Sequence, residues 1–219
     1  NNIVAVGKDA AIAPAWHAGK TIDAAGRYLI PGLWDMHVHF GGPGLVPENQ
    51  ALLPLYVANG ITTIRDCSDD IPDAVLAWRE PIEEGSLLGP QLFSSGPKLE
   101  GIDPVWTKTL EVGDKADVDA ALARLKQDHV DFVKITDSTI KPEVFLYAVA
   151  RAKSMGLRTS AHIPLGVTIE QAVDAGLTSI EHIDYAYKLG AKDEAAIVAD
   201  YNAGRITASA ARERLQRDF

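Results

Sequence analysis

The chain contains, from residue 28 to residue 39, the sequence Tyr28-Leu29-Ile30-Pro31-Gly32-Leu33-Trp34-Asp35-Met36-His37-Val38-His39. The apolar residues after Pro31-Gly32 predict a β-strand that ends at the two histidines. Because successive side chains of a strand point to opposite faces, both imidazoles should face inward, while Trp34, Met36 and Val38 should point outward. His-x-His alone more often marks ordinary packing or surface histidines, so the motif needs support from elsewhere in the chain.

Five further apolar segments follow, and segments of helical period separate them. This alternation predicts βαβ units, a parallel sheet and therefore an α/β fold. The six predicted strands are Leu33–His39, Ile61–Arg65, Gln91–Ser95, Phe132–Ile135, Arg158–His162 and Thr178–His182.

The flanking segments have a different pattern. Short apolar pieces between turn residues predict part of a small β-sandwich over residues 1–31, including Ile3–Val6 and Tyr28–Ile30. Residues 32–189 should form the barrel part. Residues 190–219 should form a helical insertion or connection, with helices at Asp193–Ala203 and Ser209–Asp218.

Two helices between the predicted strands have clear signals. One covers Val118–Gln127 with one apolar face, and Asp117 is its predicted N-cap. The other covers Glu143–Met155 and should stop at Gly156, a residue suited to the left-handed conformation after a helix end.

Composition excludes several classes of protein. The 21 basic and 30 acidic residues give a net charge of −9, which disfavours nucleic acid as a partner, and no apolar run is long enough to predict a membrane span. Cys67 is the single cysteine, so the chain has no internal disulfide and suits a reducing compartment such as the cytoplasm. We expect the chain to begin in mid-element, so its lack of a signal pattern leaves a periplasmic or secreted location open.

The remaining histidines divide into two groups. His162 and His182 each end a predicted strand, at the edge where (β/α)8 enzymes place their active sites. His17 and His129 lie elsewhere, and we interpret both as structural.

Lys134 is unusual because it shares the inward direction of Phe132 in an otherwise apolar strand. Burial favours the neutral amine, which can add carbon dioxide and become a carbamate able to bridge two metal ions. A salt bridge to Asp66 or Asp137 is the alternative.

The stretch from Tyr28 to His39 resembles the signature of the amidohydrolase superfamily, in particular its imidazolonepropionase-like and Xaa-Pro dipeptidase-like branch. Further similar stretches follow in order, and the resemblance runs from about Ile3 to His182: Gly60–Asp66, Phe132–Ile135, Ala161–Pro164 and Gly176–His182. It implies a (β/α)8 TIM-type barrel, here incomplete with about six strands, next to part of an N-terminal β-sandwich.

The resemblance also implies a binuclear metal centre. His37 and His39 would hold the more buried of two divalent ions, His162 and His182 would hold the second, and carboxylated Lys134 would bridge them. Imidazole and carboxylate-like ligands without thiolate favour Zn²⁺, with Mn²⁺, Co²⁺ and Fe²⁺ as alternatives. Such a centre would use a metal-bridging hydroxide for hydrolysis.

Relatives in this superfamily take a further ligand and general base from an aspartate that ends the eighth strand. The sequence offers no such residue, because Asp193, Asp200 and Asp218 lie in polar segments of helical period. We therefore expect either a fragment of a longer protein or a barrel that a second polypeptide, or a homo-oligomer, completes.

The predicted activity is hydrolysis of carbon–nitrogen bonds in a small molecule or short peptide: a peptide, an N-acyl amino acid or a cyclic amide. Esters, lactones or phosphotriesters on the same centre are the alternative, and so is a catalytically incompetent chain that binds metal or acts as a scaffold. Trp106, in the loop Gly96–Gly113, and Tyr185, after the sixth strand, are candidate substrate contacts, and packing between loops is their alternative role.

Overall fold

The computed structural model describes residues 3–12 and 16–217. The chain divides into two compact units, Asn1–Pro31 and Gly32–Phe219.

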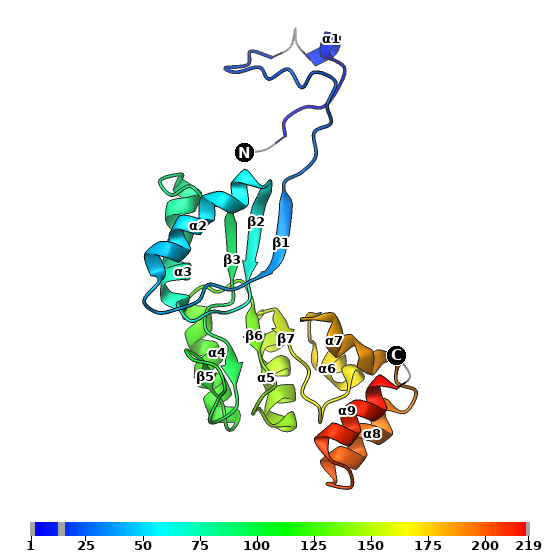
Figure 1. Ribbon diagram of the computed structural model, residues 1–219. Coiled ribbons are helices and arrows are strands. Elements are labelled where there is room, and N and C mark those ends of the chain that lie inside the picture. The colour runs from blue at the N-terminus through cyan, green and yellow to red at the C-terminus, as the bar shows by residue number, and fades with distance from the viewer. Residues whose placement is uncertain (1–2, 13–15, 218–219) are drawn as a thin grey trace. The chain divides into compact units, whose positions relative to one another are not determined.

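Strands and helices alternate through the second unit, as Figure 1 shows from β1 in blue to the last helices in red. The strands are β1 (Leu33–Val38), β2 (Ile61–Asp66), β3 (Gln91–Ser94), β4 (Leu99–Glu100), β5 (Leu110–Glu111), β6 (Val133–Ile135), β7 (Thr159–Ala161) and β8 (Ser179–Ile180). The helices between and after them are α2 (Val46–Ala58), α3 (Pro72–Glu84), α4 (Lys115–Gln127), α5 (Pro142–Ser154), α6 (Ile169–Ala175), α7 (Ile183–Ala186), the 3₁₀ helix η2 (Tyr187–Gly190), α8 (Glu194–Asn202) and α9 (Ala208–Gln216). The six strands expected from the sequence are present as β1, β2, β3, β6, β7 and β8.

All strand pairs are parallel. β1, β2 and β3 form one sheet, and β5, β4, β6, β7 and β8 form another in that order. Ser94 at the end of β3 accepts a hydrogen bond from the backbone N–H of Asp131 (2.9 Å), which links the two sheets. Within the described residues, β1 pairs only with β2 and β8 only with β7, so both have a free edge.

The β4 and β5 strands were not expected. β4 continues the chain beyond β3 and pairs with β6, so the third predicted strand, Gln91–Ser95, is followed by a second short strand that lies outside the predicted bounds. Thr136 donates a backbone hydrogen bond to Leu99 (3.0 Å) across that junction.

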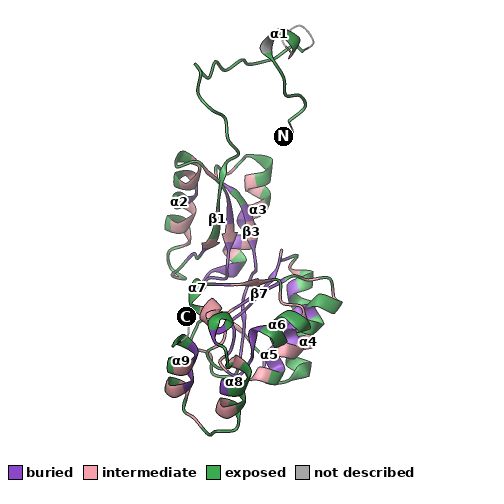
Figure 2. Ribbon diagram, turned by 90° about the vertical axis from the view of Figure 1, so that its right-hand side faces the viewer, coloured by how far each residue is buried: buried purple, intermediate pink, exposed green. Residues whose placement is uncertain are grey.

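The hydrophobic core lies between the strands and the helix faces that cover them, where buried residues concentrate in Figure 2. Its larger part packs α4, α5 and α6 on β6 and β7, and its centre includes Leu122, Phe145 and Ile135. A smaller part packs α2 and α3 on β1, β2 and β3.

One helix end agrees with its prediction from the sequence, and another does not. Gly156 adopts a left-handed conformation (φ 76°) just after α5, as predicted. The predicted N-cap of α4 was wrong, because the side chain of Asp114 caps it by accepting from the N–H groups of Ala116 and Asp117. Asp117 instead accepts from the N–H of Gly113 (2.9 Å), within the same turn.

Strand β1 departs from strict alternation. Its register with β2 shifts between Asp35 and Val38. Trp34, Met36 and His37 all line one cavity of about 800 Å³ bounded by β1, β2, β3 and β8. The predicted outward directions of Trp34 and Met36 were therefore wrong, because a bulge brings two consecutive residues to the same face. Val38 packs outward into the core, as predicted.

The first unit contains one short helix, α1 (Asp9–Ile12), and no strand within residues 3–12 and 16–31. The expected partial β-sandwich is thus not seen in the described part. Tyr28 and Leu29 are 96% and 97% exposed, so the predicted strand at Tyr28–Ile30 has no apolar surface to cover it. The domain limits 1–31, 32–189 and 190–219 stay predictions.

The C-terminal segment forms the two expected helices, α8 and α9. Ala211 and Leu215 are buried on one stripe of α9, as predicted, while Asp218 and Phe219 lie outside the described residues. No helix in residues 3–12 and 16–217 has the length and apolarity needed to cross a membrane.

A buried carboxylate holds the loop that follows β6. Glu100 is fully buried and accepts hydrogen bonds from the backbone N–H groups of Gly101, Ser138, Thr139 and Ile140 (2.9–3.1 Å). A Cβ on Gly101 would lie 2.2 Å from the carbonyl oxygen of Thr139, so the close approach requires glycine. Glu100 thereby fixes the loop that carries Asp137.

We expect Glu100→Gln to lower the free energy of unfolding by about 1–3 kcal/mol, because the amide nitrogen would replace Oε2 and face the N–H of Ser138, so two donors would oppose each other next to a buried group. Urea unfolding followed by circular dichroism measures the change. Glu111→Gln is the matched control, since the exposed Glu111 carboxylate accepts from Asp103 alone, at 3.3 Å. Equal stability of the two variants would contradict this account of Glu100.

Candidate metal centre

The five predicted ligands come together at the carboxyl ends of the strands. His37 is the next-to-last residue of β1 and His39 follows that strand. Lys134 lies on β6, and His162 and His182 follow β7 and β8. Ring centroids are 4.8 Å apart for His37 and His39, 4.5 Å for His37 and His182, and 5.0 Å for His162 and His182.

The imidazoles of His37 and His39 each have one nitrogen held by an acceptor. His37 Nδ1 lies 2.6 Å from Glu181 Oε2, and His39 Nδ1 donates to the carbonyl oxygen of Ser68. A carbonyl and an ionised carboxylate only accept, so both Nδ1 atoms carry hydrogen. The two Nε2 atoms then face each other at 2.9 Å, each with a lone pair. A proton or a metal ion between or beside them would satisfy both lone pairs.

Burial keeps these rings neutral. It is the largest influence on His37, His39 and His182 and lowers the pKa of each. A neutral imidazole is the form that binds metal.

His182 has an unusual backbone. Its φ of 65° lies outside the regions that residues with a Cβ prefer. Strand alternation would send Glu181 and His182 to opposite faces, but here both approach His37. Such local strain is typical of functional sites.

Lys134 is only 1% exposed, and its Nζ has no hydrogen-bond partner among the described residues. Burial lowers the pKa of Lys134 to about 8. The alternative of a salt bridge is not seen, because Asp66 accepts from Ser94 Oγ (2.7 Å) and Asp137 from the Tyr185 hydroxyl (2.9 Å). A buried amine without a partner is costly unless it is modified or meets an anion.

The donor set fits divalent metal ions. Zn–N bonds of about 2.0–2.1 Å place two nitrogens of one ion roughly 2.9 Å apart at a right angle and roughly 3.4 Å apart at a tetrahedral angle. The separation of the Nε2 atoms of His37 and His39, 2.9 Å, is within this range. Like Lys134 Nζ, the buried His162 Nε2 has no partner within the described residues.

Sequence reasoning missed a carboxylate beneath the histidines. Glu181 is 7% exposed, and besides His37 it accepts from Arg65 Nη1 (2.8 Å), Ser160 Oγ and Ser179 Oγ (3.4 Å). Burial alone would raise the pKa of Glu181, but the hydrogen bonds from Ser160, Arg65 and His37 lower it to about 2. The sequence signal that could have identified Glu181 was its position next to a histidine at a predicted strand end, together with Arg65 on β2.

One other group of possible ligand atoms lies nearby among the described residues: His37, Cys67 and Glu181. Arg65 Nη1 lies 3.1 Å from Cys67 Sγ and 2.8 Å from Glu181 Oε1, so a fixed positive charge already occupies this side. Burial also raises the pKa of Cys67 to about 12, which keeps the thiol protonated. The contact with Arg65 therefore argues against Cys67 as a ligand.

The two candidate substrate contacts differ in their surroundings. Trp106 is half exposed, and its ring lies 5.2 Å from Lys98 Nζ. Tyr185 stacks on the His162 ring (5.0 Å, 17°) and donates to Asp137, which also lies 3.3 Å from His162 Nδ1.

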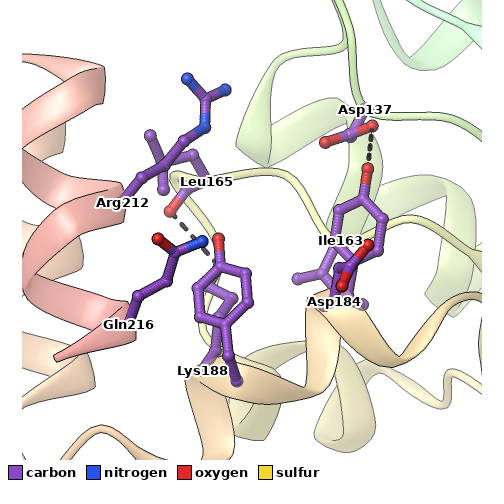
Figure 3. A pocket seen from close by; sticks show the side chains of 9 residues that line it. Asp137, Ile163, Leu165, Asp184, Lys188, Arg212 and Gln216 are labelled. Atoms are coloured by element: carbon purple, nitrogen blue, oxygen red, sulfur yellow. Dashed lines mark hydrogen bonds between the residues drawn. The ribbon is translucent and has the colours of Figure 1, made fainter. Parts of the chain in front are cut away.

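A pocket of about 330 Å³ opens beside Tyr185 (Figure 3). Asp137, with its hydrogen bond from Tyr185, forms one wall, and Arg212 on α9 lies across from it. The pocket therefore adjoins His162 through Tyr185.

The two described C-terminal aspartates that the sequence analysis set aside, Asp193 and Asp200, do not lie at the end of a strand. Asp200 pairs with Arg205 (2.8 Å) and Arg214 (3.3 Å) near α8 and α9, and Asp193 precedes α8. Asp218 lies outside the described residues.

No family model matches the chain. It is 28% identical over 167 residues to a dihydroorotase of Trichlorobacter lovleyi, covering 74% of this chain and 37% of that protein. It is 22% identical over 214 residues to an ochratoxinase of Aspergillus niger, covering 72% and 44%. A solved Xaa-Pro dipeptidase with bound methionine in its active site has a TM-score of 0.58 and 21% identity, covering 86% and 60%. The chain thus spans less than half the length of these two curated relatives.

Parallel strands alternating with helices, together with these matches, place the chain in the amidohydrolase superfamily. Within the superfamily, the ochratoxinase and the solved prolidase and Xaa-Pro dipeptidase structures are what the chain resembles. The predicted superfamily and its Xaa-Pro dipeptidase-like branch are confirmed. The metal-binding roles of the five residues stay predictions.

Cys67 should be almost unreactive in the folded chain, because it is 1% exposed and its pKa is raised to about 12. Since the thiolate is the reactive form, alkylation by iodoacetamide at about pH 8 should be roughly three orders of magnitude slower than in urea. Mass spectrometry of timed samples measures both rates. Rapid labelling of the folded chain would show that the thiol is accessible or ionised.

Proposed function

We propose that this chain carries the metal centre of a hydrolase that cleaves carbon–nitrogen bonds in a small molecule or short peptide. The observation that carries the proposal is the convergence of four imidazoles on one point, with the Nε2 atoms of His37 and His39 2.9 Å apart and their Nδ1 atoms held by acceptors. The names of its relatives, which include a Xaa-Pro dipeptidase, favour an amide or peptide substrate.

Each ligand has a proposed role. His37 and His39 would hold the more buried ion, His162 and His182 the second, and carboxylated Lys134 would bridge them. When bound, two such ions, with Zn²⁺ favoured, acidify a water molecule and polarise the carbonyl group that it attacks. The protein's part is to keep the imidazoles neutral and fixed and to shield the centre.

The pocket beside Tyr185 supports a small substrate. Its volume of about 330 Å³ and its position next to His162 suit the part of a substrate beyond the scissile bond. Tyr185 would form its wall on the side of the metal centre. Trp106 does not line this pocket, and it is proposed as a separate substrate contact because its ring is half exposed.

The general base is proposed to come from further strands of the whole protein. The free edges of β1 and β8 each present unpaired backbone groups, which additional parallel strands would satisfy. They would be supplied by the same polypeptide, a second polypeptide or another copy of the chain. If no such strands join, the alternative of a chain that binds metal without turnover applies.

Metal loading and a substrate panel test the proposal. The reconstituted chain should bind close to two divalent ions, and His37→Ala/His39→Ala should bind about one fewer and unfold more readily, because metal binding stabilises the folded state. Elemental analysis measures the ions, and His17→Ala/His129→Ala is the control.

The panel is run on the longest natural polypeptide that contains this sequence. It compares dipeptides, N-acyl amino acids and cyclic amides with esters, lactones and phosphotriesters. Amide hydrolysis that the His37→Ala/His39→Ala variant lacks is the expected result. Activity confined to esters or phosphotriesters would favour the alternative chemistry, and an absence of bound metal after reconstitution would remove the proposal.

Lys134 should take up carbon dioxide when metal is present, because a protonated amine would repel two cations and a carbamate would bind them. Carbon-13 NMR with labelled bicarbonate should show one carbamate signal that Lys134→Ala lacks. That variant should lose metal or activity, partly rescued by short carboxylic acids. Lys188→Ala is the matched control: Lys188 is also 1% exposed, but its Nζ donates to three carbonyl oxygens. A signal that survives in Lys134→Ala would refute the assignment.

A further inference from the structure

We propose that Glu181 is a positioning residue that fixes the proton of His37 on Nδ1 and so leaves Nε2 free to bind a divalent ion. The inference rests on the proposed metal centre for its purpose. The hydrogen bonds on which it depends are formed between residues of this chain and involve no metal ion.

The two oxygens of Glu181 face different partners. Oε2 lies 2.6 Å from His37 Nδ1. Oε1 accepts from Arg65 Nη1 (2.8 Å), from Ser160 Oγ and from Ser179 Oγ (3.4 Å). Donors surround Oε1, so the carboxylate cannot rotate without losing them, and Oε2 stays directed at His37.

Arg65 holds this carboxylate in place. Its guanidinium lies 4.0 Å from the centre of the Phe132 ring and also donates to the carbonyl oxygen of Met36 (3.1 Å), the residue before His37. One arginine on β2 thus fixes both Glu181 and the β1 backbone that carries His37. A planar guanidinium is always charged and only donates, so it cannot exchange roles with its acceptors.

This geometry makes Glu181→Gln informative. The Gln oxygen must take the Oε1 position, because Arg65 and Ser160 need an acceptor there. The NH₂ group would then face His37 Nδ1, which would have to accept, and the ring proton would move to Nε2. The isosteric variant therefore reverses the tautomer of His37 and blocks its metal-binding nitrogen.

The first readout needs no metal. Long-range ¹H–¹⁵N NMR of the metal-free chain at about pH 8, above the pKa of free histidine, distinguishes the two tautomers. His37, assigned by its loss in His37→Ala, should carry hydrogen on Nδ1 in the wild type and on Nε2 in Glu181→Gln. Ser160→Ala removes a donor from Oε1 without touching Oε2, so it should keep the wild-type tautomer.

The second readout is the affinity for Zn²⁺, measured by competition with a chelator. Glu181→Gln should weaken one of the two ions by about 10–100-fold, the usual effect of losing a group that orients a ligand histidine. Asp131→Asn is the matched control, because Asp131 also pairs with an arginine (Arg79, 3.4 Å) and a backbone N–H (Ser94, 2.9 Å) but contacts no imidazole. Its affinity should stay within about twofold of wild type.

The outcomes separate two failures. If the wild-type chain binds no Zn²⁺, the proposed function fails, and the tautomer of His37 alone decides whether Glu181 positions it. A wild-type His37 protonated on Nε2 overturns the inference. So does an affinity loss in Glu181→Gln without a change of tautomer, or a change of tautomer without an affinity loss.

Discussion

Parallel pairing is the constraint on which the rest of this structure depends. Strands that run in one direction present all their carboxyl ends at one edge, and the helices that return the chain stay outside. His37 and His39, Lys134, His162 and His182 are up to 145 residues apart in the sequence, yet they meet because each lies at that edge. The core of each layer needs only to be apolar and well packed for this to happen.

Two buried carboxylates fix the positions of side chains and loops at the carboxyl ends of the strands. Glu100 gathers four backbone N–H groups of the loop after β6, and Glu181 gathers Arg65, Ser160 and His37. In both cases an acceptor-only group is surrounded by donors, so its orientation is fixed by the count of hydrogen bonds. Loop and ligand geometry thus depend on two acidic side chains that the solvent barely reaches.

The sequence predicted those features that depend on neighbouring residues along the chain. Apolar runs located all six strands, and their ends placed the histidines and Lys134 at one edge. It was not informative where distant residues decide together. The bulge in β1 depends on pairing with β2, and the role of Glu181 depends on Arg65, 116 residues away along the chain. The cap of α4 fell three residues from the predicted one, because Asp114 and Asp117 are both suitable residues and the turn geometry selects between them.

The bulge in β1 changes which residues of the strand point inward. Before it, the inward positions are Trp34 and Met36, which line the interior cavity, and after it they are His37 and His39, which point at the proposed metal centre. The inward and outward side chains therefore alternate differently before the bulge and after it. Substitutions that enlarge or shrink the apolar half can be absorbed at the bulge without rotating the imidazoles, so this part of the interior is free to vary while the ligand geometry is kept.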